Sequence, residues 1–137
     1  MKAVLALLTV AAATAAFAGQ AAAGSSNVGI TIQHVKVGCH SWAIGNGPLK
    51  ETQSLTVKAG TTLTFTNNDV MPHTLIQLTG SKVALTGKLM NTMGAKAKIV
   101  LTKPGTYVFG TKAGEDYTKG IVTVGEDHVL RLVVTVK

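Results

Sequence analysis

His73 stands in a turn between two apolar segments, and the turn itself does not require a histidine. The stretch Thr64–Thr79 reads TFTNNDVMPHTLIQLT. The residues of this stretch that suit a turn are Asn67, Asn68, Asp69 and Pro72. Their side chains bond nearby backbone groups or fix φ, so neither His73 nor Met71 is needed for turning. His73 is therefore a candidate for chemistry.

The other soft donors are one cysteine and a second group of methionines. Cys39 is followed by His40 in the sequence GCHSW, and Met90 and Met93 lie in MNTM. Thiolate, imidazole and thioether together favour copper, above all Cu(I), over hard cations. The single cysteine excludes a disulfide within the chain and a structural zinc site of several thiolates. If these side chains meet, the expected cofactor is one copper ion per chain.

The N-terminal residues have the composition of a secretory signal peptide. Lys2 precedes an apolar run from Ala3 to Phe17, and small residues follow it. Cleavage is expected after Ala18 or Ala23, so residues 1–23 form the leader and 24–137 a single domain. No later run is apolar enough to cross a membrane, because polar residues interrupt each one. We expect an exported protein, periplasmic or extracellular.

The formal net charge of +7 raises the question of an anionic partner. The lysines are spread singly over the chain, and aromatic residues make up only 4% of it. Nucleic-acid binding is therefore not expected, since bases would lack stacking partners. We expect a monomer with a solvated basic surface and a preference for acidic protein partners.

Alternating polar and apolar residues predict short β-strands along the rest of the chain. The predicted strands are 28–32, 35–37, 54–57, 61–67, 73–78, 97–101, 106–109, 120–124 and 129–136. A bulge is expected at Gln33–His34, and irregular connections over 80–89 and 111–117. No segment after the leader has a sustained 3.6-residue period. The pattern predicts an all-β fold, an antiparallel β-sandwich.

Two segments of the chain resemble cupredoxins of the plastocyanin type. The run VKAGTTLTFTNND from Val57 to Asp69, followed by Pro72-His73-Thr74, is similar to the region before the first copper histidine of that family. The run KPGTYVF from Lys103 to Phe109 is similar to the strand that ends at the family's copper cysteine. The resemblance covers most of the mature chain. It implies a Greek-key sandwich in which His73 binds copper.

The usual C-terminal copper loop of that family is missing. After Phe109 the chain reads GTKAGEDYT, without the family's cysteine, histidine and methionine. By the resemblance, the first strand (29–37) and the strand 61–67 end at the end of the sandwich that carries His73, and the strand that starts near Ala97 begins there. Cys39, His73 and Met93 would then meet at this end. We therefore expect a cupredoxin site whose thiolate, from Cys39, has moved to the first strand.

Each candidate ligand also has an ordinary structural explanation. Cys39 and Met93 could be packing residues, and His73 could be a turn histidine bonded to backbone. His40 would face away from Cys39 in a regular strand, although a turn relaxes this rule. The remaining candidate ligands are Met90, Met71 and His128. His128 precedes the last strand and also suits a turn.

Catalysis has little support in the sequence. There is no recognisable nucleophile and base, no phosphate loop and no dinucleotide fingerprint. We expect a copper protein that is not an enzyme and passes single electrons to a redox partner. The first alternative is a copper carrier or store that works with a copper-trafficking partner, since trafficking needs an accessible site and electron transfer a rigid one. The second alternative is a metal-free β-sandwich used for interaction.

Overall fold

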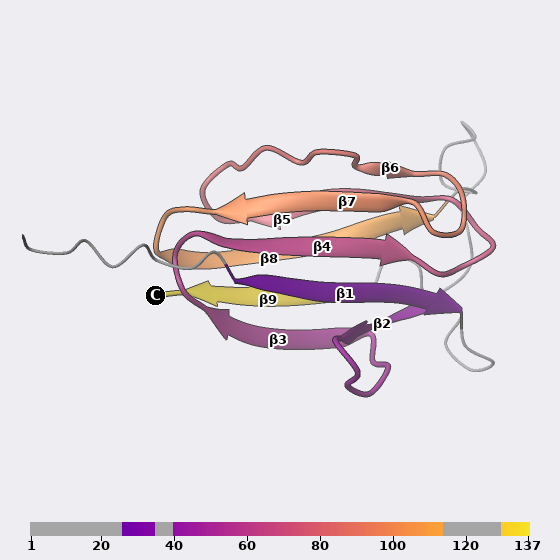
Figure 1. The fold of residues 1–137 in the computed structure, drawn as a ribbon, viewed down its shortest axis with the longest axis horizontal. Helices are drawn as coiled ribbons and strands as arrows, with labels where there is room; N and C mark the ends of the chain where they lie inside the picture. The colour runs from indigo at the N-terminus through magenta and orange to yellow at the C-terminus, as the bar shows by residue number, and fades with distance from the viewer. Residues whose placement is uncertain (1–25, 35–39, 114–129) are drawn as a thin grey trace, which may run out of the picture.

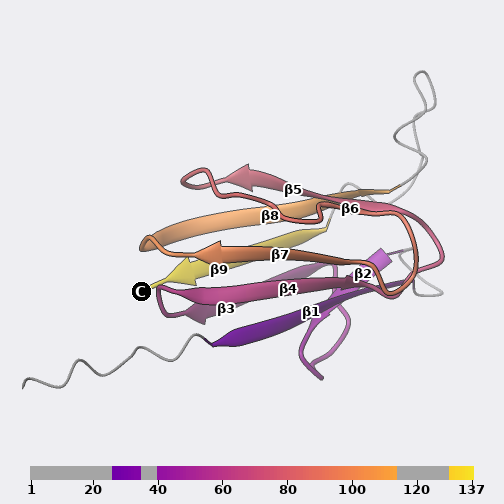
Figure 2. The same cartoon turned by 45° about the horizontal axis from the view of Figure 1, so that its top comes forward.

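The protein forms a sandwich of two β-sheets (Figures 1 and 2). The computed structural model describes residues 26–34, 40–113 and 130–137. One sheet contains, in spatial order, β2 (His40–Ile44), β1 (Asn27–His34), β4 (Thr61–Asn67) and β7 (Lys96–Leu101). The other contains β3 (Thr52–Val57), β9 (Arg131–Val136), β8 (Gly105–Ala113), β5 (His73–Thr79) and β6 (Leu89–Met90). The predicted all-β sandwich is confirmed.

The pairing of strands differs in two places from the antiparallel arrangement that we predicted. β1 pairs with β4 in parallel, and β3 pairs with β9 in parallel, whereas the other pairs are antiparallel. Parallel neighbours need a crossover connection. The chain between β1 and β4 provides one, because it forms β2 in one sheet and β3 in the other. Both sheets are therefore mixed.

Strand pairing also explains two differences from the predicted boundaries. β8 continues to Ala113, where irregular structure was expected from residue 111 onward, because β5 pairs with it over this length. The short strands β2 and β6 were not predicted; pairing with β1 and β5 holds them in place. The predicted strands 35–37 and 120–124 lie outside the described residues.

The bulge expected at Gln33–His34 is absent from the described part of β1. These residues pair in register with Ser41 and His40 of β2. The register shift of the structure lies instead in β5, between Gln77 and Thr79.

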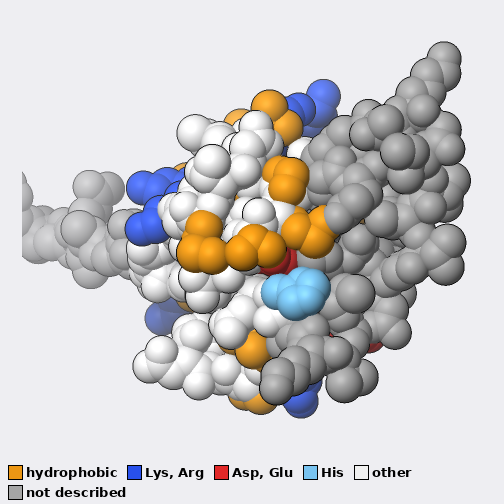
Figure 3. Space-filling view, turned by 90° about the vertical axis from the view of Figure 1, so that its right-hand side faces the viewer, with side chains coloured by type: hydrophobic (Ala, Val, Ile, Leu, Met, Phe, Trp, Pro, Cys, Tyr) orange, Lys and Arg blue, Asp and Glu red, His pale blue; other side chains and the backbone are white. Residues whose placement is uncertain are grey.

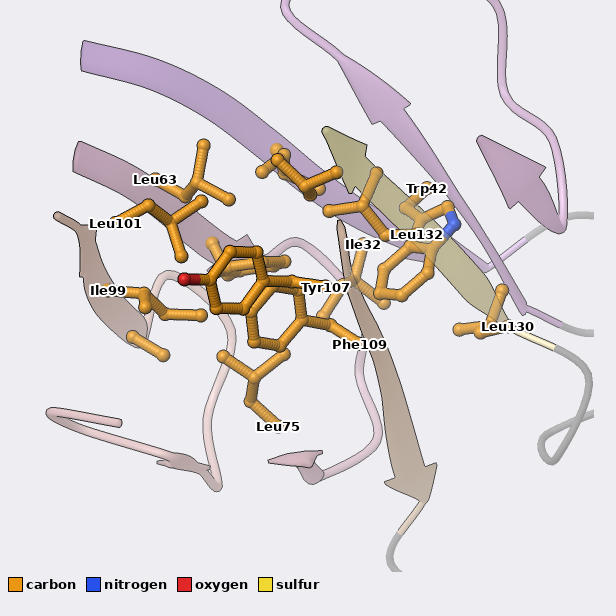
Figure 4. Packing of buried hydrophobic residues seen from close by; sticks show 14 of the residues in the cluster. Ile32, Trp42, Leu63, Leu75, Ile99, Leu101, Tyr107, Phe109, Leu130 and Leu132 are labelled. Atoms are coloured by element: carbon orange, nitrogen blue, oxygen red, sulfur yellow. The ribbon is translucent and has the colours of Figure 1, made fainter. Parts of the chain in front are cut away.

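The period-two alternation directs one face of each sheet into a common core. Buried and half-buried residues alternate along the whole of β4, and exposed and buried residues alternate along β7. The bulkiest buried side chains are Trp42, Tyr107, Phe65 and Phe109. Trp42, Tyr107 and Phe109 are labelled in the close view of the core (Figure 4). The rings of Phe65 and Phe109 meet edge to face at a centroid distance of 6.2 Å, a favourable geometry for aromatic pairs. The core thus joins the two sheets through aromatic rings.

Several strands begin or end at one end of the sandwich, which we call the His73 end. β1 and β4 both end there because they are parallel, and β7, antiparallel to β4, begins there (Figure 1). β5 begins at this end with His73, beside the last residue of β8. The predicted meeting of the first strand, β4 and β7 at one end is confirmed. None of the described residues is helical, so no helix among them could span a bilayer.

Candidate metal centre

His73 is the first residue of β5, and its side chain is completely buried. Side chains two residues apart in a strand lie on the same face of the sheet. His73 therefore faces the same side as Leu75, which is part of the hydrophobic core. A polar ring at such a position is costly unless hydrogen bonds or a metal satisfy its nitrogens.

Asp69 supplies one of these interactions. Its Oδ2 lies 3.0 Å from Nε2 of His73, and both side chains have no exposed area. Its Oδ1 accepts a hydrogen bond of 3.1 Å from the backbone N–H of Met71. From the sequence, Asp69 is expected only as a turn residue. The signal in the sequence was an acid four residues before the histidine, in the short loop that follows a strand.

Asn67 holds the loops around this pair together. It is the last residue of β4 and takes the next buried position after Phe65, so an amide ends the apolar face of the strand. Its Nδ2 donates to the carbonyl oxygens of Met71, at 2.8 Å, and Met90, at 3.0 Å. Its Oδ1 accepts from the backbone N–H of Asp69 at 2.9 Å. One buried side chain therefore connects the β4–β5 turn to β6.

The backbone of Asn67 fixes the segment before β7 as well. Its N–H donates to the carbonyl of Ala95 at 2.9 Å, and its carbonyl accepts from Gly94 at 2.6 Å. Gly94 has a φ of +84°, a conformation that glycine adopts without strain. The residues between β6 and β7 are thereby held against the His73 end.

His34 lies at the solvent edge of the same cluster. It ends β1 on the face that carries the buried residues Ile30 and Ile32. Its Nδ1 is 3.9 Å from Oδ2 of Asp69, and its side chain is 51% exposed. The sequence predicts a bulge at this residue, but the structure has it paired in register with His40. Its exposed side chain lies next to the carboxylate that binds His73.

The methionines of the predicted ligand set occupy different environments. Met90 is fully buried and is the register partner of His73 across β5 and β6. Partners of this kind lie on the same face of a sheet with adjacent side chains. Met93 is 57% exposed, and Met71 is half-buried. The structure therefore pairs the buried imidazole with Met90, although the sequence favoured Met93 as the thioether ligand.

The rest of the predicted ligand set is only partly described. Cys39 and His128 lie outside the described residues. The backbone of His40 begins β2 and pairs with His34, but its side chain is not described. Among the side chains that are described, no group of three or more His, Cys, Asp or Glu residues is arranged to hold a metal. His73 and Met90 are thus the two predicted ligands whose close placement the structure describes.

Apolar side chains and a histidine occupy the surface at the His73 end (Figure 3). The large exposed hydrophobic residues of the described segments include Val70, Leu89 and Met93, which all lie in or beside the loops of this end. A groove of about 560 Å³ lies away from it, between the C-terminal half of β5 and the segment from Lys82 to Lys88. No predicted ligand lines that groove.

Comparisons with known proteins point to solved cupredoxin structures. No protein-family model and no curated protein matches the chain. A purple cupredoxin from Nitrosopumilus maritimus is 20% identical, with 80% of this chain and 98% of that chain covered and a TM-score of 0.45. An amicyanin from Paracoccus versutus is 18% identical, with coverages of 84% and 83% and a TM-score of 0.43. An oxidised amicyanin variant is 22% identical, with coverages of 86% and 87% and a TM-score of 0.48.

Proposed function

We propose that this protein binds one copper ion at the His73 end and carries single electrons. The observation that carries the proposal is the pairing of His73 with Met90: an imidazole and a thioether, both without exposed surface, are register partners on adjacent strands. These two donors suit copper in either oxidation state better than they suit calcium or magnesium. The donor set therefore fits the metal that the sequence resemblance implies.

Cys39 is the proposed thiolate ligand. It is the only cysteine of the chain, and a peptide bond joins it to His40, where β2 begins beside the end of β1. Consecutive Cα atoms are about 3.8 Å apart, and the described neighbour His40 pairs with His34 at the His73 end, which supports this assignment. A thiolate with histidine and a weak thioether is a ligand combination that holds both Cu(I) and Cu(II).

Met90 is the preferred thioether in this proposal. Its burial beside His73 gives it the more favourable position, whereas the side chain of Met93 is mostly in solvent. Met71, His40 and His128 remain candidates for a further ligand position. Copper held in this way would supply a one-electron change between Cu(I) and Cu(II). The buried side chains of the chain itself would exclude water and restrict ligand motion, which electron transfer requires.

We propose an exported, monomeric protein, not an enzyme, that meets a redox partner of acidic character. Export is supported by the leader-like residues 1–23, and the acidic partner by the net charge of +7. The apolar residues Val70, Leu89 and Met93 would provide contact surface near the metal for such a partner.

A copper titration of the metal-free protein tests this function. Addition of Cu(II) should give one bound copper per chain and a strong visible absorption from thiolate-to-copper charge transfer. Cys39→Ser should remove the absorption, and His73→Ala should weaken binding, while far-UV circular dichroism confirms that both variants fold. Tight zinc binding without copper binding would contradict the metal assignment. A Cys39→Ser protein with the parent's spectrum and affinity would contradict the assignment of the thiolate.

Copper transport is the second candidate function, and the exposure of Met93 favours it. An accessible thioether at the edge of the site is a suitable entry point for Cu(I). The rate at which a Cu(I) chelator removes copper distinguishes the two functions. A carrier should release copper rapidly, and Met93→Leu should slow the release. An electron carrier should hold its copper through many cycles of oxidation and reduction.

A further inference from the structure

Thr111 places a hydroxyl group in the core without a hydrogen-bonding partner among the described residues. It lies near the end of β8, and only 3% of its surface is exposed. No described residue makes a hydrogen bond to its Oγ1. We infer that this oxygen is a weak ligand that stabilises Cu(II) relative to Cu(I) at the His73 end. The inference rests on the proposed copper function and adds a donor that sets the reduction potential.

Strand register directs the side chain of Thr111 to the core face of its sheet. The residues two and four positions before it in β8, Phe109 and Tyr107, are both buried in the core. Thr111 is also the register partner of Leu75, a core residue of β5. Directly opposite residues of neighbouring strands project from the same face of a sheet. The hydroxyl therefore continues the row of aromatic side chains toward the end of the sandwich where His73 begins β5.

Thr111 and Met90 lie on the two strands that flank His73. The sheet runs in the order β8, β5, β6, and His73 of β5 pairs with Met90 of β6. Leu75, two residues further along β5, pairs with Thr111, which makes Thr111 a diagonal neighbour of His73. Diagonal neighbours of this kind lie about 7–8 Å apart, close enough for one metal ion to contact both side chains. An imidazole, a thioether and a hydroxyl, all buried, thus share one region of the core face.

A buried hydroxyl without a partner is costly to the metal-free fold, because it has lost its hydrogen bonds to water. Thr61, with 1% exposure, shows the usual solution, since its Oγ1 shares a hydrogen bond of 2.7 Å with Oγ of Ser26. Valine has nearly the shape of threonine and would fill the position of Thr111 without this cost. A cost that brings no structural gain is expected at a functional site.

Oxygen is a harder donor than sulfur, and this difference determines the effect expected of Thr111. Cu(I) prefers soft thiolate and thioether ligands, whereas Cu(II) also accepts oxygen as a weak, long ligand. Binding of Oγ1 should therefore stabilise Cu(II) more than Cu(I) and lower the reduction potential. A hydroxyl that instead donated a hydrogen bond to a copper-bound sulfur would withdraw charge from the sulfur and favour Cu(I). The sign of the change in potential distinguishes these two roles.

The first measurement compares the stability of metal-free variants in urea. Thr111→Val should have a urea midpoint equal to or above that of the parent, since it removes a hydroxyl that has no partner. Thr106→Val is the matched control, because Thr106 is exposed in the same strand, and it should leave both the midpoint and copper binding unchanged. A lower midpoint in Thr111→Val would show that the metal-free fold uses the hydroxyl, and it would overturn the inference.

The second measurement gives the affinity of each variant for both oxidation states of copper. Thr111→Val should weaken Cu(II) binding about tenfold and leave Cu(I) binding within about twofold. A tenfold loss for Cu(II) alone raises the potential of a one-electron couple by about 59 mV. Thr111→Ser keeps the hydroxyl and should keep the parent's potential. An unchanged or lower potential in Thr111→Val, or an equally raised potential in Thr111→Ser, would overturn the inference.

The outcomes for the inference and for the proposed function are distinguishable. A parent protein that binds no copper refutes the copper function, and the role of Thr111 falls with it. If the parent binds copper and Thr111→Val keeps the parent's potential, the copper function stands and the role of Thr111 is refuted. A lower urea midpoint of metal-free Thr111→Val likewise refutes the role of Thr111 alone.

Discussion

Replacement of Asn67 by alanine should destabilise the protein more than its small change in volume suggests. The side chain makes three hydrogen bonds at 2.8 to 3.0 Å: a buried one from Asp69, a buried one to the carbonyl of Met90 and a partly buried one to the carbonyl of Met71. Each bond is worth about 0.5–1.5 kcal/mol, and a buried group that loses its partner costs about 1–3 kcal/mol. For three backbone groups without replacement partners, we expect a loss of about 3–5 kcal/mol in the free energy of unfolding.

Urea denaturation followed by circular dichroism measures this loss. Asn68→Ala is the matched control, because its side chain is exposed in the same turn, and it should change the free energy of unfolding by less than about 0.5 kcal/mol. A loss below about 1 kcal/mol in Asn67→Ala would show that water replaces the amide, and would refute a large contribution from its three hydrogen bonds. An unchanged m-value would confirm that the comparison concerns stability and not the compactness of the unfolded state.

Three further predictions test the ligand choice, the metal and the core. Met90→Leu conserves side-chain volume and should cost less than about 1.5 kcal/mol of stability, yet it should weaken Cu(I) binding in a chelator competition. Met93→Leu should leave Cu(I) binding unchanged; weaker binding in Met93→Leu than in Met90→Leu would contradict the preference for Met90. Free Cu(I) at about 100 times its Kd should raise the free energy of unfolding by about 2.7 kcal/mol, whereas calcium at the same concentration should leave a thermal melt unchanged. Phe109→Ala should lower the free energy of unfolding, measured in urea, by about 3–5 kcal/mol, since the ring is fully buried beside Phe65 and Tyr107. A loss below about 2 kcal/mol would show that the core collapses around the cavity.

The sequence by itself determined the fold class and most of the strands. Alternation in Thr61–Asn67 predicted β4 with the bounds that the structure has, because side chains in a strand alternate between two faces and one face is buried. The same local pattern located β5, β7 and β9 to within a few residues. It also identified His73 as a residue that its turn did not need. These features are local, so they can be read from neighbouring residues.

The tertiary structure alone decided which side chains surround His73. Met90 and Met93 are three residues apart and chemically alike, but only Met90 pairs with His73 and is buried, since β6 joins the sheet at that residue. Asp69 and Asn67 looked like turn formers, because the burial of the Asp69–His73 pair and the hydrogen bond from Asn67 to Met90, 23 residues away, arise only when the sandwich is packed. The parallel pairing of β1 with β4 was likewise hidden, because a strand's alternation is the same whichever way its neighbour runs.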